Sequence, residues 1–159
     1  MIRPTIPADT PVLLLLAEQT GVFKPLEIKA LEEVLDDYHA SNQAVGHRAV
    51  SSERAGQVAG FAYYAPAAMT DRTWYLWWIF VGKAWQAGGI GSELLRYAEE
   101  EVRQRRGRML LVETSSLPDY DLTRRFYLKH RYEPAAVLAD YYRKGDDMVV
   151  FRKRLVDEE

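Results

Sequence analysis

The stretch "VGKAWQAGGIGSELL", Val81 to Leu95, places three glycines within four positions and continues directly into an amphipathic pattern with helical spacing. The start of a helix presents backbone N–H groups without partners in the helix, and with the helix dipole they favour a phosphate or pyrophosphate. Glycine lets such an anion approach because no Cβ stands in the way. The same glycines also suit a tight turn from a strand into a helix without any ligand, so both interpretations stay open.

Two familiar phosphate motifs do not fit this stretch. A P-loop requires Gly-Lys-Ser/Thr at a fixed spacing, and these residues do not follow the glycines. The dinucleotide fingerprint requires a third glycine at the place where the chain, counted from Gly89 and Gly91, has Leu94. The stretch therefore predicts a different kind of anion site or a purely structural turn.

Hydrophobic periodicity on both sides of this stretch predicts a mixed α/β fold of the α+β type. We expect Gly21 to end the first helix and Gly107 to be the C′ residue of the helix that begins at the glycines. The order β-α-α-β-β-β-α-β-α-β-β places a parallel crossover at the glycine-rich turn. We expect strands at 2–6, 47–53, 57–66, 73–81, 109–114, 132–138 and 147–155, and helices at 10–20, 25–39, 89–105 and 121–130.

Composition limits the class of protein. A chain of 159 residues with 48% hydrophobic content has the size of one ordinary domain, so we expect a single domain over residues 1–159. The formal net charge of −2 does not suit a dedicated nucleic-acid binder. The absence of cysteine excludes disulfides and cysteine nucleophiles, and it fits a cytoplasmic setting. The apolar run Pro11 to Ala17 is too short to span a bilayer, so we expect no membrane association.

Gln86-Ala87-Gly88-Gly89-Ile90-Gly91 resembles motif A of the GNAT superfamily of acyl-CoA N-acyltransferases, whose core signature is Gln/Arg-x-x-Gly-x-Gly/Ala. "VAGFAYY" is similar to a typical third strand of that family, and "RRFYLKHRYEP" is similar to its Phe/Leu-Tyr-x-x-x-Gly-Phe segment. The resemblance covers most of the chain. It implies a GNAT-like fold, with a mixed, mostly antiparallel sheet of about six or seven strands flanked by about four helices.

The resemblance also implies an N-acetyltransferase that transfers the acetyl group of acetyl-CoA directly to a primary amine in a ternary complex. Tyr127 stands where many members carry a tyrosine that protonates the CoA thiolate, and a phenol with a pKa of about 10 is protonated at neutral pH. The residues that the resemblance assigns to CoA binding are Phe80, Val81, Gln86, Ala87, Gly88, Gly89, Ile90, Gly91, Ser92 and Arg124.

Three positions depart from the family pattern. Lys83 replaces a common proline, Ala87 replaces a common glycine, and Arg131 replaces the glycine of the Tyr-x-x-x-Gly-Phe segment. We expect Ala87 to do no harm if Gly88 relieves the same crowding. Arginine tolerates a left-handed backbone poorly, so we expect the helix before Arg131 to end in a different way.

The residue that takes the proton from the attacking amine is less evident. Many relatives carry a glutamate on the strand before motif A, but residues 73–81 contain no carboxylate. Glu113 on the next strand is the best replacement, although a carboxylate facing water at a strand end, or a water relay to backbone carbonyls, explains the pattern equally well. The histidines His39, His47 and His130 do not have metal-ligand spacing, so we expect no metal.

Two other classes of function remain open. A non-catalytic acyl-CoA sensor or regulatory domain of the same fold would explain the missing glutamate. A nucleotide-phosphate enzyme on another α/β fold would explain the glycines alone. The sequence carries no signature for the acceptor, which a small molecule, a peptide or a protein could supply. The exposed last strand, together with the family's habits, favours a homodimer.

Overall fold

The computed structural model describes residues 1–156, and its elements follow the predicted order. The strands and helices are β1 (Ile2–Pro4), α1 (Thr10–Gln19), α2 (Pro25–Ala40), β2 (Arg48–Arg54), β3 (Gln57–Pro66), β4 (Thr73–Val81), α3 (Ile90–Gln104), β5 (Met109–Ser115), α4 (Asp121–Lys129), β6 (Glu133–Arg143) and β7 (Asp146–Arg154). Short 3₁₀ turns occupy Pro7–Asp9, Asn42–Val45, Lys83–Trp85 and Pro118–Tyr120.

The strands form one seven-stranded sheet in the order β1-β2-β3-β4-β5-β7-β6. Strands β4 and β5 run parallel, with Thr73 beside Met109 and Tyr75 beside Leu111, and α3 forms the crossover between them. The pairs β1–β2, β2–β3, β5–β7 and β6–β7 are antiparallel. The predicted mixed, mostly antiparallel sheet with four helices is confirmed.

Internal contacts divide the chain into two compact units. Unit 1 comprises Met1–Pro66 and Leu76–Glu101, and unit 2 comprises Ala67–Tyr75 and the chain from Val102 onward. Strand β4 and helix α3 each contribute residues to both units. The single domain over 1–159 stays a prediction.

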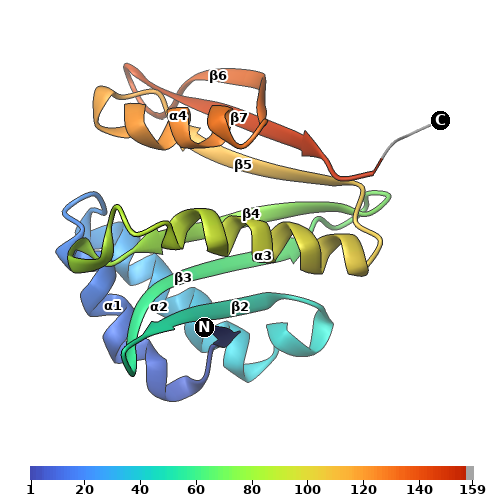
Figure 1. Cartoon of the computed structure of the whole chain (residues 1–159). Helices are drawn as coiled ribbons and strands as arrows, with labels where there is room; N and C mark the ends of the chain where they lie inside the picture. The colour runs from blue at the N-terminus through green and yellow to red at the C-terminus, as the bar shows by residue number, and fades with distance from the viewer. Residues whose placement is uncertain (157–159) are drawn as a thin grey trace. The chain divides into compact units, whose positions relative to one another are not determined.

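In unit 1, β3 is buried on both faces, because helices lie on each side of it (Figure 1). Phe61 and Tyr63 belong to a core cluster with Leu13, Leu31 and Leu35 of helices α1 and α2. On the opposite face, a Cβ at Gly60 would lie 3.0 Å from Leu94 and 3.2 Å from Ile90 of α3. Gly60 therefore lets α3 pack closely against the strand.

In unit 2, α4 covers one face of the strands (Figure 1). The ring of Tyr127 on α4 lies 5.8 Å from that of Phe151 on β7, and Phe151 pairs with Val112 on β5. Alternate residues of β5 point to opposite faces. Leu110 and Val112 are accordingly buried on the α4 side, whereas Leu111 and Glu113 are only half-buried on the other side.

Helix α4 ends with a left-handed residue, contrary to our expectation for Arg131. Arg131 has a φ of 69° and donates its N–H to Leu128 O at 3.0 Å, while Tyr132 N–H donates to Tyr127 O at 3.0 Å. This is a Schellman motif, and the rings of Tyr127 and Tyr132, 5.5 Å apart, make its hydrophobic contact. The hydrogen bonds and the ring contact hold arginine in a conformation that glycine adopts more easily.

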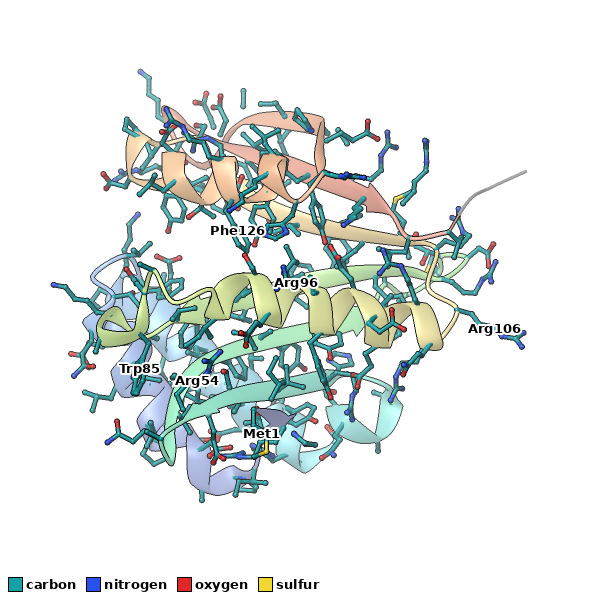
Figure 2. The ribbon with its side chains drawn as sticks, in the orientation of Figure 1. Met1, Arg54, Trp85, Arg96, Arg106 and Phe126 are labelled. Carbon is teal, nitrogen blue, oxygen red and sulfur yellow. The ribbon has the colours of Figure 1, made fainter. Side chains whose placement is uncertain are left out.

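Helix α3 ends in the same way, so the prediction that Gly107 is its C′ residue is wrong. Arg106 has the left-handed φ of 65°, and its side chain points away from the ribbon into solvent (Figure 2). Gly107 follows at C″ and donates its N–H to Val102 O at 2.8 Å. A Cβ at Gly107 would lie 2.2 Å from Val102 and 2.9 Å from Trp74, so packing requires the glycine.

The exposed edge of the sheet is β6, which corrects the expectation of an exposed last strand. Strand β7 lies between β5 and β6 in the sheet order. All residues of Glu133–Arg143 are exposed, including Val137, Leu138, Tyr141 and Tyr142. The strand also extends five residues beyond the predicted Leu138, and its pairing with β7 is irregular between Leu138 and Arg143. The alternating apolar and polar sequence pattern does not continue through such an irregular stretch, so it could not predict the end of the strand.

Candidate active site

The glycine-rich turn in unit 1 takes its shape from two left-handed residues, Ala87 with a φ of 71° and Gly89 with a φ of 80°. Gly88 does not have a positive φ, and a Cβ there would meet Trp85 O at 3.5 Å, so relief of crowding at Ala87 by Gly88 stays a prediction. An alanine tolerates this region less well than glycine. The turn thus keeps a strained alanine next to an unstrained glycine.

The start of α3 offers backbone donors at this turn. The first hydrogen bond of the helix runs from Glu93 N–H to Gly89 O at 3.0 Å. The N–H groups of Ile90 and Gly91 precede it in the chain and therefore have no acceptor carbonyl within the helix. Residues 86–89 are exposed, and nothing lies within 4 Å of the place where a Cβ of Gly89 would be. This open, glycine-lined helix start fits a phosphate group.

Gln86 supports the turn with its side chain. Its Nε2 donates to Val81 O at 3.2 Å, and Trp85 N–H donates to Gly82 O at 2.8 Å. Phe80 is 7% exposed and its ring lies 5.5 Å from Phe61 in the core of unit 1. The side chain of Phe80 therefore packs inside, and only its backbone is left for a ligand. Ser92 is half-buried in the first turn of α3.

Tyr127 lies in unit 2 and is 1% exposed, with its ring packed against Tyr132 and Phe151. Burial raises the pKa of its phenol above the ordinary value of 10, so the hydroxyl keeps its proton at neutral pH. Within residues 1–156, no side chain or carbonyl hydrogen-bonds this hydroxyl. Within the described part of the chain, the phenol is therefore a protonated donor without an acceptor.

Glu113 lies on the other face of β5 from Tyr127. It pairs with Val150 on β7, and among the described residues it has neither a hydrogen bond nor an ion pair. Burial raises the pKa of this carboxyl above its ordinary value of 4.5. A half-buried carboxylate without a cation beside it can accept a proton or bind a positively charged group.

Arg124 already has partners at the end of β5. Its Nη1 donates to Ser115 O at 2.6 Å and to Leu117 O at 3.0 Å, and its Nη2 lies 3.9 Å from the Asp121 carboxylate. These contacts hold the loop between β5 and α4. Any contact of this guanidinium with a ligand would come in addition to this supporting role.

Two tyrosines near Glu113 were not predicted from the sequence. Burial, and after it the charge of Glu113, raises the pKa of Tyr75 on β4. Burial and then Glu113 are also the two largest causes that raise the pKa of Tyr142 on β6 to about 12. The doubled tyrosine in "ADYYRK" is the only sequence signal for Tyr142, and it lies where the pairing of β6 is irregular. Only the folded sheet brings these residues near Glu113.

Two other kinds of feature are absent from residues 1–156. None of the helices is long and apolar enough to cross a membrane. No group of three or more His, Asp or Glu side chains is arranged to hold a metal ion in this part of the chain.

Residues 14–131 match the family model described as the Acetyltransferase (GNAT) family. A solved structure from Desulfovibrio desulfuricans, assigned to the GNAT family of acetyltransferases, is 34% identical, with a TM-score of 0.94 over 98% of this chain and 99% of that one. A comparison with curated proteins gave no match.

More distant structures share the fold. An aminoglycoside 6'-N-acetyltransferase complexed with coenzyme A is 18% identical, with a TM-score of 0.77 over 100% of this chain and 99% of that one. A structure from Salmonella typhimurium with its cofactor acetyl-CoA is 16% identical, with a TM-score of 0.79 over 100% and 95% of the two chains. At these identities the likeness shows the fold alone.

Proposed function

The chain belongs to the acetyltransferase (GNAT) family and is an acyltransferase, and on that premise we propose that it transfers the acetyl group of acetyl-CoA to a primary amine in a ternary complex. The observation that carries this proposal is the open helix start at Gly89, with the donors of Ile90 and Gly91 ahead of the first helical hydrogen bond. The relatives with bound coenzyme A or acetyl-CoA support the choice of donor.

We propose that the backbone from Gln86 to Ser92 holds the pyrophosphate of CoA, and that the backbone of Phe80 and Val81 lies along the pantetheine arm. Ala87, Gly88, Gly89, Ile90 and Gly91 supply the N–H groups, and the Gln86 side chain holds the turn through Val81 O. Arg124 supports the loop after β5 and takes part in cofactor binding from there.

Acetyl-CoA supplies the acetyl group as a thioester. The amine nitrogen forms a bond to the acetyl carbon as the C–S bond breaks, and Tyr127 gives its phenolic proton to the leaving sulfur. The raised pKa of Tyr127 ensures that the proton is present, and solvent restores it afterwards. Glu113, or a water relay that ends at backbone carbonyls, takes the proton that the amine loses.

We propose that residues 1–159 act as one catalytic domain in the cytoplasm, without nucleic acid, membrane or metal. We also propose a homodimer that forms through β6, because its exposed edge with Val137 and Leu138 can pair with a second copy. Sedimentation velocity at increasing protein concentration measures that association.

The test is CoA release by a panel of primary amines, followed with a thiol reagent. Because the chain has no cysteine, the protein adds no background to this assay. Tyr127→Phe should lower kcat by about 100-fold or more. The matched control is Tyr132→Phe, which removes a hydroxyl from the neighbouring buried ring and should keep most of the activity.

A non-catalytic acyl-CoA sensor is the second candidate. It is favoured by the position of Tyr127 and Glu113 on opposite faces of β5. For catalysis by both residues, the bound substrates would have to extend past an edge of that strand, whereas a sensor has no such requirement. A sensor would bind acetyl-CoA without releasing CoA for any amine, and Tyr127→Phe would then change nothing. A rise in melting temperature with ATP instead of acetyl-CoA would favour a nucleotide-phosphate enzyme over both.

A further inference from the structure

The strands of unit 2 have a second face, opposite α4. Strand register places Tyr75, Leu111 and Glu113 on this face, because Tyr75 pairs with Leu111 and Glu113 lies two residues further along β5. Val150 and Met148 of β7 and Leu138 of β6 continue the same face through their pairing. No helix of unit 2 within residues 1–156 covers these side chains.

Among the described residues, Glu113 is the one carboxylate on this face without an ion-pair or hydrogen-bond partner, and the exposed cation Arg154 lies at the far end of the face beside Met109. Arg152 also belongs to the face, but its guanidinium contacts the Glu133 carboxylate at 2.7 and 2.9 Å. Along the register, Glu113 has the apolar neighbours Leu111, Val150 and Ala136. Its polar neighbour is Ser115, whose hydroxyl donates to the buried Asp146 carboxylate. A carboxylate that is partly desolvated among apolar side chains gains more from a cation than a fully hydrated one does.

The two tyrosines add to this preference for a cation. The field of Glu113 reaches Tyr75 on one side and Tyr142 on the other, and Asp146 contributes to it at Tyr142. The same negative field that disfavours a second anion favours a positive group. Aromatic faces also attract ammonium groups, most strongly where water is partly excluded.

We propose that this face, which we name the Glu113 face, binds the acceptor as a primary ammonium with one positive charge and an apolar body. The charge sits at the Glu113 carboxylate between Tyr75 and Tyr142, and the body lies over Leu111, Val150 and Met148. The single unpaired carboxylate matches one ammonium, not the several of an aminoglycoside or polyamine. This inference rests on the proposed acetyl transfer and names the substrate class for it.

Binding of 2-phenylethylamine to the full chain, in the presence of CoA without an acetyl group, tests this inference by titration calorimetry. We expect 2-phenylethylamine to bind at least about tenfold more tightly than the neutral 2-phenylethanol. Glu113→Gln should remove that difference, and Tyr142→Ala should weaken amine binding by about three- to tenfold. Asp119→Asn, which removes a charge from an exposed residue of the same unit, should leave it unchanged.

Equal binding of the amine and the alcohol, or an unchanged preference in Glu113→Gln, would overturn the inference. The outcome for the proposed function is separate, because it is measured by CoA release. Amine binding that depends on Glu113 without any CoA release keeps the inference about the face but contradicts acetyl transfer. CoA release from an amine that binds equally well to Glu113→Gln keeps acetyl transfer and contradicts the inference.

Discussion

Strand β3 in unit 1 and strand β5 in unit 2 are covered differently. β3 is buried on both faces, by α1 and α2 on one side and by α3 on the other. β5 is buried along the face that carries Leu110, Val112 and Thr114. On its other face Leu111 and Glu113 are half-buried, and only Ser115 at the end of the strand is buried. A strand with two covered faces has almost no accessible side chains for binding or catalysis. The half-buried face of β5, in contrast, holds the Glu113 carboxylate, which has no ion-pair partner among the described residues. This difference suggests that the acceptor is recognised in unit 2.

Two adjacent leucines of β5 measure the difference between its faces. Leu110 is completely buried on the α4 side, and Leu111 is half-buried on the Glu113 face. Leu110→Ala should lower the free energy of unfolding by about 2–5 kcal/mol, because it removes buried methyl groups and leaves a cavity. Leu111→Ala should cost about 1 kcal/mol or less. Urea unfolding of both variants measures this.

Equal losses for the two variants would contradict the difference between the faces. They would show that Leu111 is fully covered in solution, for example by a second copy of the chain. Repeating the unfolding at several protein concentrations separates these cases, because the stability of a dimer depends on concentration and that of a monomer does not.

Each unit also contains left-handed residues that are not glycine, and substituting one of them in each unit compares their strain. Arg131→Gly in unit 2 and Ala87→Gly in unit 1 should each raise the free energy of unfolding by about 0.5–1 kcal/mol, because glycine adopts a positive φ without the Cβ penalty. Arg131→Ala is the control, since it removes the side chain but keeps the strain. A loss of stability in both glycine variants would mean that these residues are not left-handed in solution.

Much of this fold could be predicted from the sequence, because it depends on local patterns. The strand at Thr73–Val81 has the predicted bounds, and motif A identified the turn that leads into α3. The helix ends could not be predicted as well, since Arg106 and Arg131 occupy left-handed positions for which glycine is the usual signal. The position of Tyr75 and Tyr142 near Glu113 depends on how β4, β5, β7 and β6 assemble, and no local pattern carries that information.

The smallest expected effect concerns the stability cost of Glu113 itself. Its pKa in the folded protein lies above the ordinary value of 4.5, because burial disfavours the charged form. Between that value and the folded pKa, the folded state binds more protons than the unfolded state, so stability rises as the pH falls through this window. At pH 7 the ionised carboxylate therefore destabilises the fold, and Glu113→Gln should be more stable than the parent protein.

The excess stability of Glu113→Gln should shrink as the pH is lowered through the folded pKa of Glu113, and it should level off below 4.5, where the carboxyl is protonated in both states. Thermal unfolding of both proteins from pH 7 to pH 4 measures this, with Asp119→Asn as the exposed control. A stability difference that stays constant across this pH range would mean that Glu113 is fully hydrated. Its carboxylate would then attract a cation no more strongly than any exposed carboxylate does.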